Sequence, residues 1–345
     1  MEASTAAEAP STRTTSVAGP DVGGGQSSPD VGSSVRLDQP GVWVVRPDGS
    51  DAAFIGDDLA NAWYDDSSLY YFDAQAGDLV RVGLDGSRQT LSVPDGPRWN
   101  APGVQSRRIL QAAVGGGRVA YNWVHRDDPG AGASVAPLDL TSAVDLDHDG
   151  YVSVSPRGDR VLVGDGSGVW VYDGDGHPIA GPLHPGQLAS FGTWSADDHH
   201  VMLLLDSTNT CVLDITDGSC ITTPLNHNDA IDAPLLSDGS TLVAGVFDLG
   251  AEDDRLVVGP YGGPLSTIAP HSRFEFASPV DDRILYSDFP FIHRDRPSHV
   301  HVINPDGSGD HVIATTLVGS LATTCGFAPN GQWVLVRVVV NRGGG

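Results

Sequence analysis

The stretch Ser155-Pro156-Arg157-Gly158-Asp159-Arg160-Val161-Leu162-Val163 joins a tight polar turn directly to a run of aliphatic and β-branched residues. Pro and Gly are typical of turns, and a short apolar run bounded by turn residues is typical of a β-strand. The same turn-then-strand unit occurs seven times in the chain. Its turns begin at residues 64, 114, 155, 195, 237, 278 and 328, and its strands are expected at 69–72, 119–123, 161–163, 201–205, 242–246, 284–286 and 333–340.

A second series, made of a strand, a tight turn and a further strand, runs out of phase with the first. Its first strands are expected at 42–45, 79–82, 134–136, 169–172, 211–213, 256–258 and 300–303. A repeat of about 44 residues is typical of propeller blades. The sequence therefore predicts an all-β fold, a seven-bladed β-propeller of four-stranded antiparallel blades. Strands at 42–45 and 52–55 are expected to join those at 321–327 and 333–340 in one blade and so close the ring.

Composition supports this fold and limits the classes of partner. The chain has 44 acidic and 19 basic side chains, a formal charge of −25, and these divide into 40 Asp, 4 Glu, 19 Arg and no Lys. Asp, with 43 Gly and 24 Pro, belongs to turns, whereas Glu, Lys and Met cover helix surfaces, so a mostly helical fold is excluded. Arg107-Arg108 is the one basic cluster. Nucleic acids and anionic membranes, which both select for basic residues, are therefore unsuitable partners.

The N-terminal segment differs from the rest of the chain. Residues 1–40 are rich in Ala, Ser, Thr, Gly and Pro and cannot bury enough apolar surface to offset the entropy of ordering. We predict a disordered tail at 1–40 and a propeller domain at 41–345. The chain shows no apolar stretch long enough to span a membrane and no secretory signal.

The turns Ser155-Pro156-Arg157-Gly158 and Ala328-Pro329-Asn330-Gly331, with the hairpin phrase at 300–307, resemble the TolB-like propeller repeat, a WD-type β-propeller repeat. The resemblance covers residues 41 to the C-terminus and is weakest in blade two, where Gly115-Gly116-Gly117 replaces the usual turn. Family members are mostly periplasmic, secreted or lipid-anchored binding scaffolds, and the tail at 1–40 resembles the tether of actinobacterial lipoproteins. The resemblance thus implies an extracytoplasmic protein, secreted or anchored to the envelope.

Two acidic patterns are candidate sites. Asp145, Asp147 and Asp149 alternate as in a calcium loop, but the acids that such loops carry at their ninth or twelfth position are missing. An Asp-rich connector without a cofactor is therefore the favoured interpretation, and a calcium site is the alternative. The loop after the strand of the first series begins with an acid in five blades. We expect these acids to form a rim on one face that attracts cations or a basic partner, or to cap their own turns. They are Asp73, Asp165, Asp206, Asp248 and Asp288.

The two long loops at 125–132 and 288–298 are further candidates for binding, because insertions on rigid scaffolds tend to hold binding residues. The second loop combines aromatic and basic side chains that are enriched at interfaces, and packing of its Phe side chains across the channel is the alternative. Its candidate contact residues are Phe289, Phe291, His293, Arg294 and Arg296. His299 and His301 alternate on one strand face, which is compatible with a metal pair, although the sequence fixes no third ligand.

Cysteine spacing bears on the compartment. Cys211 and Cys220 flank a turn, and a four-residue loop would place them in diagonal register, where a disulfide is possible. A two-residue loop would separate the sulfurs. Cys325 is left over on an inner strand. A disulfide would indicate an oxidising compartment.

These features favour a monomeric, non-catalytic, exported scaffold that binds a protein or cell-envelope component through one face. No Gly-x-Ser-x-Gly elbow occurs, and the chain has no length left for a hydrolase domain. The alternative is a carbohydrate-active propeller enzyme, a lyase or glycosidase, which would need paired channel-facing Asp residues.

Overall fold

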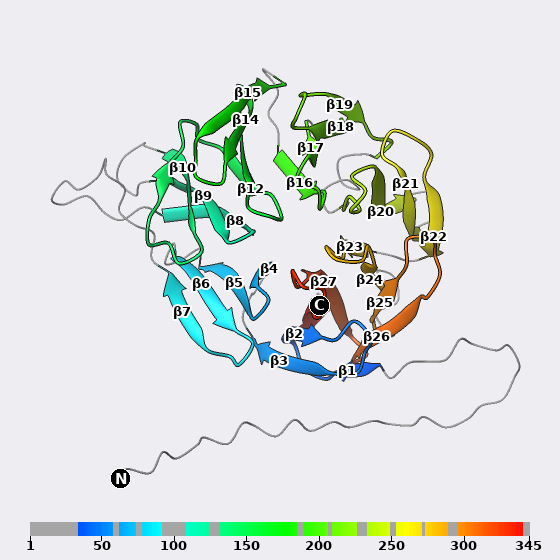
Figure 1. Ribbon diagram of the computed structural model, residues 1–345. Coiled ribbons are helices and arrows are strands. Elements are labelled where there is room, and N and C mark those ends of the chain that lie inside the picture. Colours follow the sequence, from blue (N-terminus) through cyan, green and yellow to red (C-terminus); the bar gives the residue numbers. More distant parts are fainter. Residues whose placement is uncertain are drawn as a thin grey trace, which may run out of the picture.

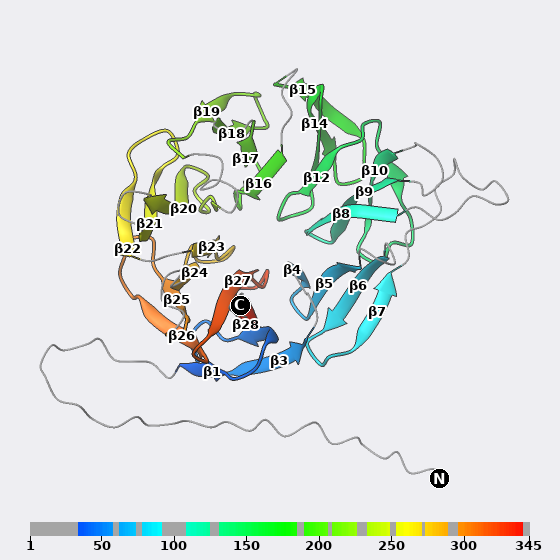
Figure 2. The same ribbon diagram turned by 180° about the vertical axis from the view of Figure 1, so that it is seen from behind.

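The computed structural model describes residues 34–57, 62–73, 78–91, 108–124, 131–184, 190–205, 209–225, 233–248, 253–270, 273–288 and 296–340. These residues form strands and turns, and no helix occurs among them. The strands build seven sheets around a central axis, which Figures 1 and 2 show from opposite sides. The predicted seven-bladed all-β propeller is confirmed. Nor does any described segment form a helix of the length and apolar character that a membrane crossing requires.

Each blade is numbered along the chain, and its strands are given from the innermost outward. Blade one consists of β4 (Ala62–Asp65), β5 (Ser68–Asp73), β6 (Asp78–Gly83) and β7 (Arg88–Leu91). Blade two consists of β8 (Arg108–Gly115), β9 (Arg118–Val124), β10 (Ala131–Pro137) and β11 (Val144–Asp145). Blade three consists of β12 (Tyr151–Val154), β13 (Arg160–Asp165), β14 (Gly168–Asp173) and β15 (Pro178–Leu183).

The remaining blades follow the same plan. Blade four consists of β16 (Ser190–Trp194), β17 (His200–Leu204), β18 (Thr210–Asp214) and β19 (Cys220–Thr222). Blade five consists of β20 (Thr241–Asp248), β21 (Asp253–Pro260) and β22 (Ser266–Pro270), and its innermost position is reduced to a bridge between Leu235 and Leu242. Blade six consists of β23 (Arg273–Ala277), β24 (Ile284–Asp288), β25 (His299–Ile303) and β26 (His311–Thr316).

Blade seven closes the ring with strands from both ends of the chain. It consists of β27 (Ser320–Phe327), β28 (Val334–Val340), β2 (Gly41–Val45) and β3 (Ala52–Gly56). The pairing of β2 with β28 sets Trp43 opposite Val336, so the N-terminal hairpin lies beside the C-terminal strands in Figure 1. The predicted two-plus-two closure is therefore confirmed.

A described strand lies before the domain boundary predicted at Gly41. Residues of β1 (Val35–Leu37) pair in parallel with β26 and add a fifth strand to blade six. Leu37 is fully buried in the core between blades six and seven. Its burial outweighs the polar composition of the preceding residues, so the predicted tail at 1–40 is wrong for residues 35–37. Residues 1–33 lie outside the described part of the chain.

Inner strands are buried on both faces because each blade is packed between two others. In β13, Val161 and Val163 pack toward blade two, whereas Leu162 between them packs toward blade four. All three side chains are fully buried. This two-sided burial accounts for the continuous apolar runs that follow the turns in the sequence.

A recurring Asp-Asp pair in the turn between the first two strands ties neighbouring blades together. The first Asp caps its own turn, and the second accepts a hydrogen bond from the turn of the preceding blade. Because the blades form a ring, the blade that precedes blade one is blade seven. Each first acid accepts a hydrogen bond from a backbone N–H of its own turn: Asp65 from Ser67 (2.8 Å), Asp197 from His199 (2.8 Å) and Asp281 from Arg283 (3.4 Å). Each second acid accepts a hydrogen bond from a backbone N–H of the preceding blade: Asp66 from Asn330 (2.9 Å), Asp198 from Arg157 (3.3 Å) and Asp282 from Ser237 (2.7 Å).

The turn of blade two carries glycine in place of the acids and lies close to the turn of the following blade. Gly116 has φ +49°, and a Cβ added there would lie 1.7 Å from the carbonyl carbon of Arg157 in the turn of blade three. Gly117 also has positive φ, at +84°, but the space around its missing Cβ is open. The glycine run that departs from the repeat motif therefore permits close approach of two turns.

Candidate functional site

A cavity of about 820 Å³ lies at the end of the channel where the turns between first and second strands meet. Residues from all seven blades line it, among them Trp63, Trp194 and Phe276 as aromatic walls and Arg157 and Asp197 as charged groups. We call it the channel-mouth cavity. Around it, the Asp-Asp pairs and the blade-two glycines bring turns of neighbouring blades into contact.

The two tryptophans of this cavity are held by hydrogen bonds to neighbouring blades. The indole N–H of Trp63 donates to the backbone oxygen of Gly326 in blade seven at 3.1 Å. That of Trp194 donates to the hydroxyl of Ser153 in blade three at 2.7 Å. With their polar atoms satisfied, the rings are positioned before any ligand arrives, which lowers the entropic cost of binding.

The carboxylates at the cavity serve the turns that carry them. Asp65 pairs with Arg81 at 2.5 Å and accepts hydrogen bonds from Ser67 and Ser68. Burial would raise the pKa of Asp65, but these hydrogen bonds and the Arg81 guanidinium hold it below its ordinary value. The pKa of Asp197 is lowered in the same way, because hydrogen bonds from its turn and the nearby His200 outweigh its burial. Both acids are thus held ionised, whereas a general acid for glycoside cleavage needs a raised pKa.

The predicted acidic rim is on the face opposite the channel-mouth cavity, because its residues stand at the far ends of the second strands. Asp165, at the end of β13, caps its own turn through the backbone N–H of Ser167 at 2.7 Å and pairs with His148 at 3.1 Å. Asp73 and Asp248 end β5 and β20, but their side chains are not described, and Asp206 lies outside the described residues. The structure therefore gives side-chain geometry for Asp165 and Asp288 of the predicted rim.

Asp288 lies next to two histidines of the neighbouring strand. Its Oδ2 is 2.6 Å from Nδ1 of His299 and 3.9 Å from Nε2 of His301. On its other side, His301 contacts Asp310, whose Oδ1 accepts a hydrogen bond from Nδ1 of His301 at 3.1 Å. The hydroxyl of Tyr286 donates a hydrogen bond to the same carboxylate at 3.0 Å. Burial alone would lower the pKa of His301, but Asp288 and Asp310 raise it to about 9. The pocket around this imidazole therefore favours positive charge.

The sequence identified these three residues separately but not as a group. Asp288 appeared as a rim residue and His299 and His301 as a strand pair without a third ligand. What was missing is the register of the β24–β25 hairpin, which sets Asp288 directly opposite His299 across a long loop. Of the predicted contact residues in that loop, Arg296 is described and exposed. The residues Phe289, Phe291, His293 and Arg294 lie outside the described part of the chain.

The calcium-like stretch does not gather its acids. Asp145 ends β11 and accepts a hydrogen bond from Ser134 at 2.7 Å, whereas Asp147 and Asp149 are exposed. In the part of the chain that is described, the one group of three or more potential ligands with converging donor atoms is Asp288, His299 and His301. The weak metal candidates Asp145, Asp147 and Asp149 do not belong to that group, and their role as a connector between blades two and three stays a prediction.

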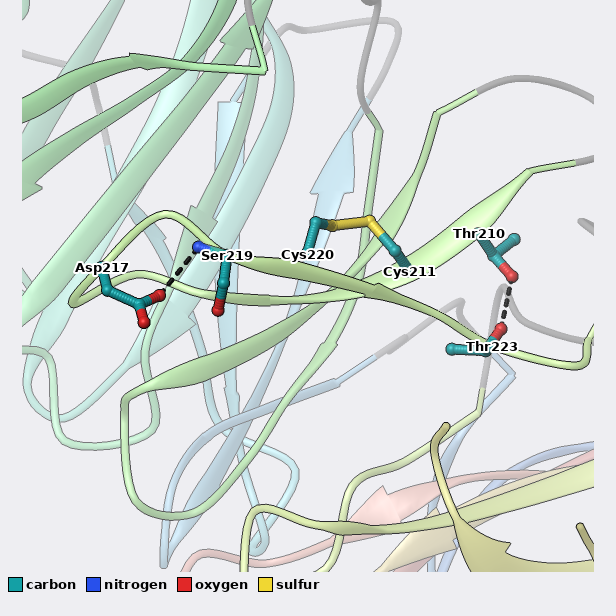
Figure 3. Close-up of a disulfide and its surroundings, with 6 residues drawn as sticks. All are labelled: Thr210, Cys211, Asp217, Ser219, Cys220 and Thr223. Carbon is teal, nitrogen blue, oxygen red and sulfur yellow. Dashed lines mark hydrogen bonds between the residues drawn. A yellow bond between two sulfur atoms is a disulfide. The ribbon is translucent and has the colours of Figure 1, made fainter. Parts of the chain in front are cut away.

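Cys211 and Cys220 form a disulfide between the two outer strands of blade four (Figure 3). The register pairs Leu213 with Cys220, so the two cysteines lie diagonally across β18 and β19 with Cα atoms 5.7 Å apart. Farther along the hairpin the hydroxyls of Thr210 and Thr223 are hydrogen-bonded at 2.6 Å. Cys325 is not disulfide-bonded and contributes to the wall of the channel-mouth cavity.

Replacing Cys211 and Cys220 by Ser is expected to lower the free energy of unfolding by about 2–3 kcal/mol, because the cross-link restricts the unfolded chain. Chemical denaturation of wild type and the double variant measures this difference. A thiol titration of denatured, non-reduced wild type should give one thiol per chain, from Cys325. Three thiols and equal stabilities would show that the bond does not form.

Comparison of the sequence with protein-family models and with curated proteins gives no match. Solved structures do match. A TolB candidate from Agrobacterium tumefaciens superimposes with TM-score 0.50 at 12% identity, covering 86% of this chain and 97% of that one. An oligogalacturonate lyase from Vibrio parahaemolyticus gives TM-score 0.50 at 11% identity, covering 76% of this chain and 79% of that one. The chain shares the fold of TolB-like propellers, and at these identities the likeness extends to the fold alone.

Proposed function

We propose that this chain is a non-catalytic, exported propeller that binds a protein or cell-envelope component through the face at which the channel-mouth cavity opens. The observation that carries the proposal is the cavity itself, with aromatic walls hydrogen-bonded to neighbouring blades and carboxylates already used by their turns. A concave apolar site with a few placed polar groups is the usual form of a binding site. The disulfide supports an oxidising, extracytoplasmic location.

The charge of the chain bears on the class of partner. At a formal charge of −25, it repels anionic surfaces and attracts cationic ones over several ångströms. We therefore expect a partner with a basic surface, whose association slows as salt concentration rises.

The proposal is tested by filling the cavity. Ala196 is half-buried and lines it, so Ala196→Trp should occupy the space without touching the blade cores. Ile179, 51% exposed on the outer strand β15, gives the control Ile179→Trp. Purified protein with each change is immobilised and exposed to an extract of the native cells, and the retained proteins and envelope polymers are compared. A ligand kept by wild type and Ile179→Trp but lost, at least tenfold, by Ala196→Trp supports the proposal. Equal retention by all three proteins contradicts it.

A second candidate, a carbohydrate-active lyase or glycosidase, is favoured by one observation, namely the two tryptophans beside the cavity carboxylates. Flat aromatic faces suit sugar rings, but Asp65 and Asp197 already accept hydrogen bonds from their own turns, which favours the non-catalytic function. Incubation with acidic and neutral oligosaccharides, followed by chromatography, is expected to yield no products. Product formation that Ala196→Trp abolishes would replace the binding proposal with the enzymatic one.

A further inference from the structure

We propose that Asp288, His299 and His301 form a binding site for a divalent first-row transition-metal ion, represented by Zn²⁺. The site is on the face opposite the channel-mouth cavity, between the second and third strands of blade six. It is independent of the proposed partner binding, so either proposal can fail without the other.

The hairpin register brings the three donors together. Asp288 is directly opposite His299, and Tyr286 is directly opposite His301, so both histidines project from the same face of β25. Oδ2 of Asp288 is 2.6 Å from His299 Nδ1 and 3.9 Å from His301 Nε2, and all three donor atoms lie within 4.8 Å of one another. Zn²⁺ bonds of 2.0–2.2 Å in a tetrahedron place donors about 3.3 Å apart. The two measured separations lie on either side of that value, so small side-chain rotations suffice.

The His301 ring is oriented for ligation by groups behind it. Its Nδ1 donates to Asp310, which also accepts from the hydroxyl of Tyr286, and the Tyr286 ring stacks on the imidazole with centroids 4.7 Å apart. A carboxylate that accepts from the non-ligating nitrogen is the usual outer-shell partner of a metal-binding histidine. The remaining nitrogen, Nε2, is buried, finds no hydrogen-bond partner among the described residues and is directed toward Asp288. A buried polar atom without a partner is costly, and a metal ion would satisfy Nε2 by taking the place of the proton on this nitrogen.

The donor set selects the class of ion. Two imidazole nitrogens and one carboxylate oxygen suit Zn²⁺ and its first-row neighbours, whereas Ca²⁺ and Mg²⁺ prefer six or more oxygen ligands. The side chains of Asp288 and His299 are 31% and 34% exposed, so a fourth position faces solvent and is available to water or to a donor from a ligand.

Two other described histidines each pair with a single carboxylate. His148 pairs with Asp165 at 3.1 Å and His177 pairs with Asp173 at 3.0 Å. Neither pair belongs to a described group of three converging donors. His177, with 77% of its side chain exposed, therefore provides a matched control, because it has the same pair chemistry without the second histidine.

The test is calorimetric titration of the whole chain with Zn²⁺ after treatment with a chelator. Wild type is expected to bind one ion with a dissociation constant on the order of 1 µM or tighter. The variant His299→Ala, which removes a partly exposed ligand and leaves the blade core intact, should weaken binding at least about 100-fold. The control His177→Ala should bind as wild type does. Asp310→Asn, which alters the positioning residue, should weaken binding about tenfold.

Two further measurements bear on the proposal. Co²⁺ should give a visible absorption band of tetrahedral type in wild type and His177→Ala, and His299→Ala should lose it. Zn²⁺ should raise the melting temperature of wild type by a few degrees and leave that of His299→Ala unchanged. Equal Zn²⁺ affinity in wild type and His299→Ala, no saturable binding to wild type, or binding of Mg²⁺ at similar affinity would each overturn the proposal.

Discussion

A chain that starts at residue 57 is expected to show no cooperative thermal unfolding and to expose its apolar core, because it lacks the two strands that close the ring. Four side chains of β2 are buried, namely Val42, Trp43, Val44 and Val45. At about 1.5–3 kcal/mol for each buried side chain, their loss removes roughly 6–12 kcal/mol. That amount is comparable with the whole stability of a typical domain, about 5–15 kcal/mol.

The control for this deletion is a chain that starts at residue 34, which retains β1, β2 and β3. Its melting temperature should lie within about 1 °C of that of the full chain. Circular dichroism and scanning calorimetry of the three proteins measure the effect. A protein starting at residue 57 that unfolds cooperatively at the full-chain temperature would contradict closure by β2 and β3.

Gly116→Ala is expected to lower the free energy of unfolding by about 3–4 kcal/mol. The new Cβ would lie 1.7 Å from the backbone of Arg157, and neither turn can yield without moving its blade. The matched control is Gly117→Ala, which also places alanine at positive φ but meets no atom within 4 Å. Backbone strain alone should cost the control about 1 kcal/mol.

Denaturant titration of both variants separates the steric effect from the backbone effect. A difference of about 2–3 kcal/mol between them is expected from the overpacking at Gly116. Equal destabilisation would show that the turns of blades two and three do not approach as closely as the structure places them.

The architecture was predictable from the sequence because turns and strands repeat in register with the blades. The out-of-phase series, beginning at 42–45 and ending at 333–340, indicated the closure that β2 and β28 form. The strand at Val35–Leu37 was not predictable, since three residues among Ser, Gly and Asp carry no periodicity and gain their order from contact with blade six. Likewise, the sequence showed only a degenerate turn at Gly115-Gly116-Gly117. The close approach of Gly116 to Arg157 explains why glycine stands there.

The candidate sites were harder to predict, because each depends on contacts between residues far apart in sequence. The channel-mouth cavity combines side chains from seven blades. The Asp288, His299 and His301 group depends on a hairpin register that a ten-residue connection hides. The excess of Asp is explained in part by the structure, where one acid of each turn pair caps the turn and the next reaches the neighbouring blade, as at Asp281 and Asp282.

Site-specific photo-crosslinking in the native cells tests most directly whether the channel-mouth cavity is the binding surface. A photoreactive amino acid is placed at position 196 in the cavity wall or at position 179 on the outer strand of blade three. We predict a discrete covalent adduct from position 196 that weakens as salt is added, and none from position 179. The same adducts from both positions, or an adduct from position 179 alone, would contradict binding through this face.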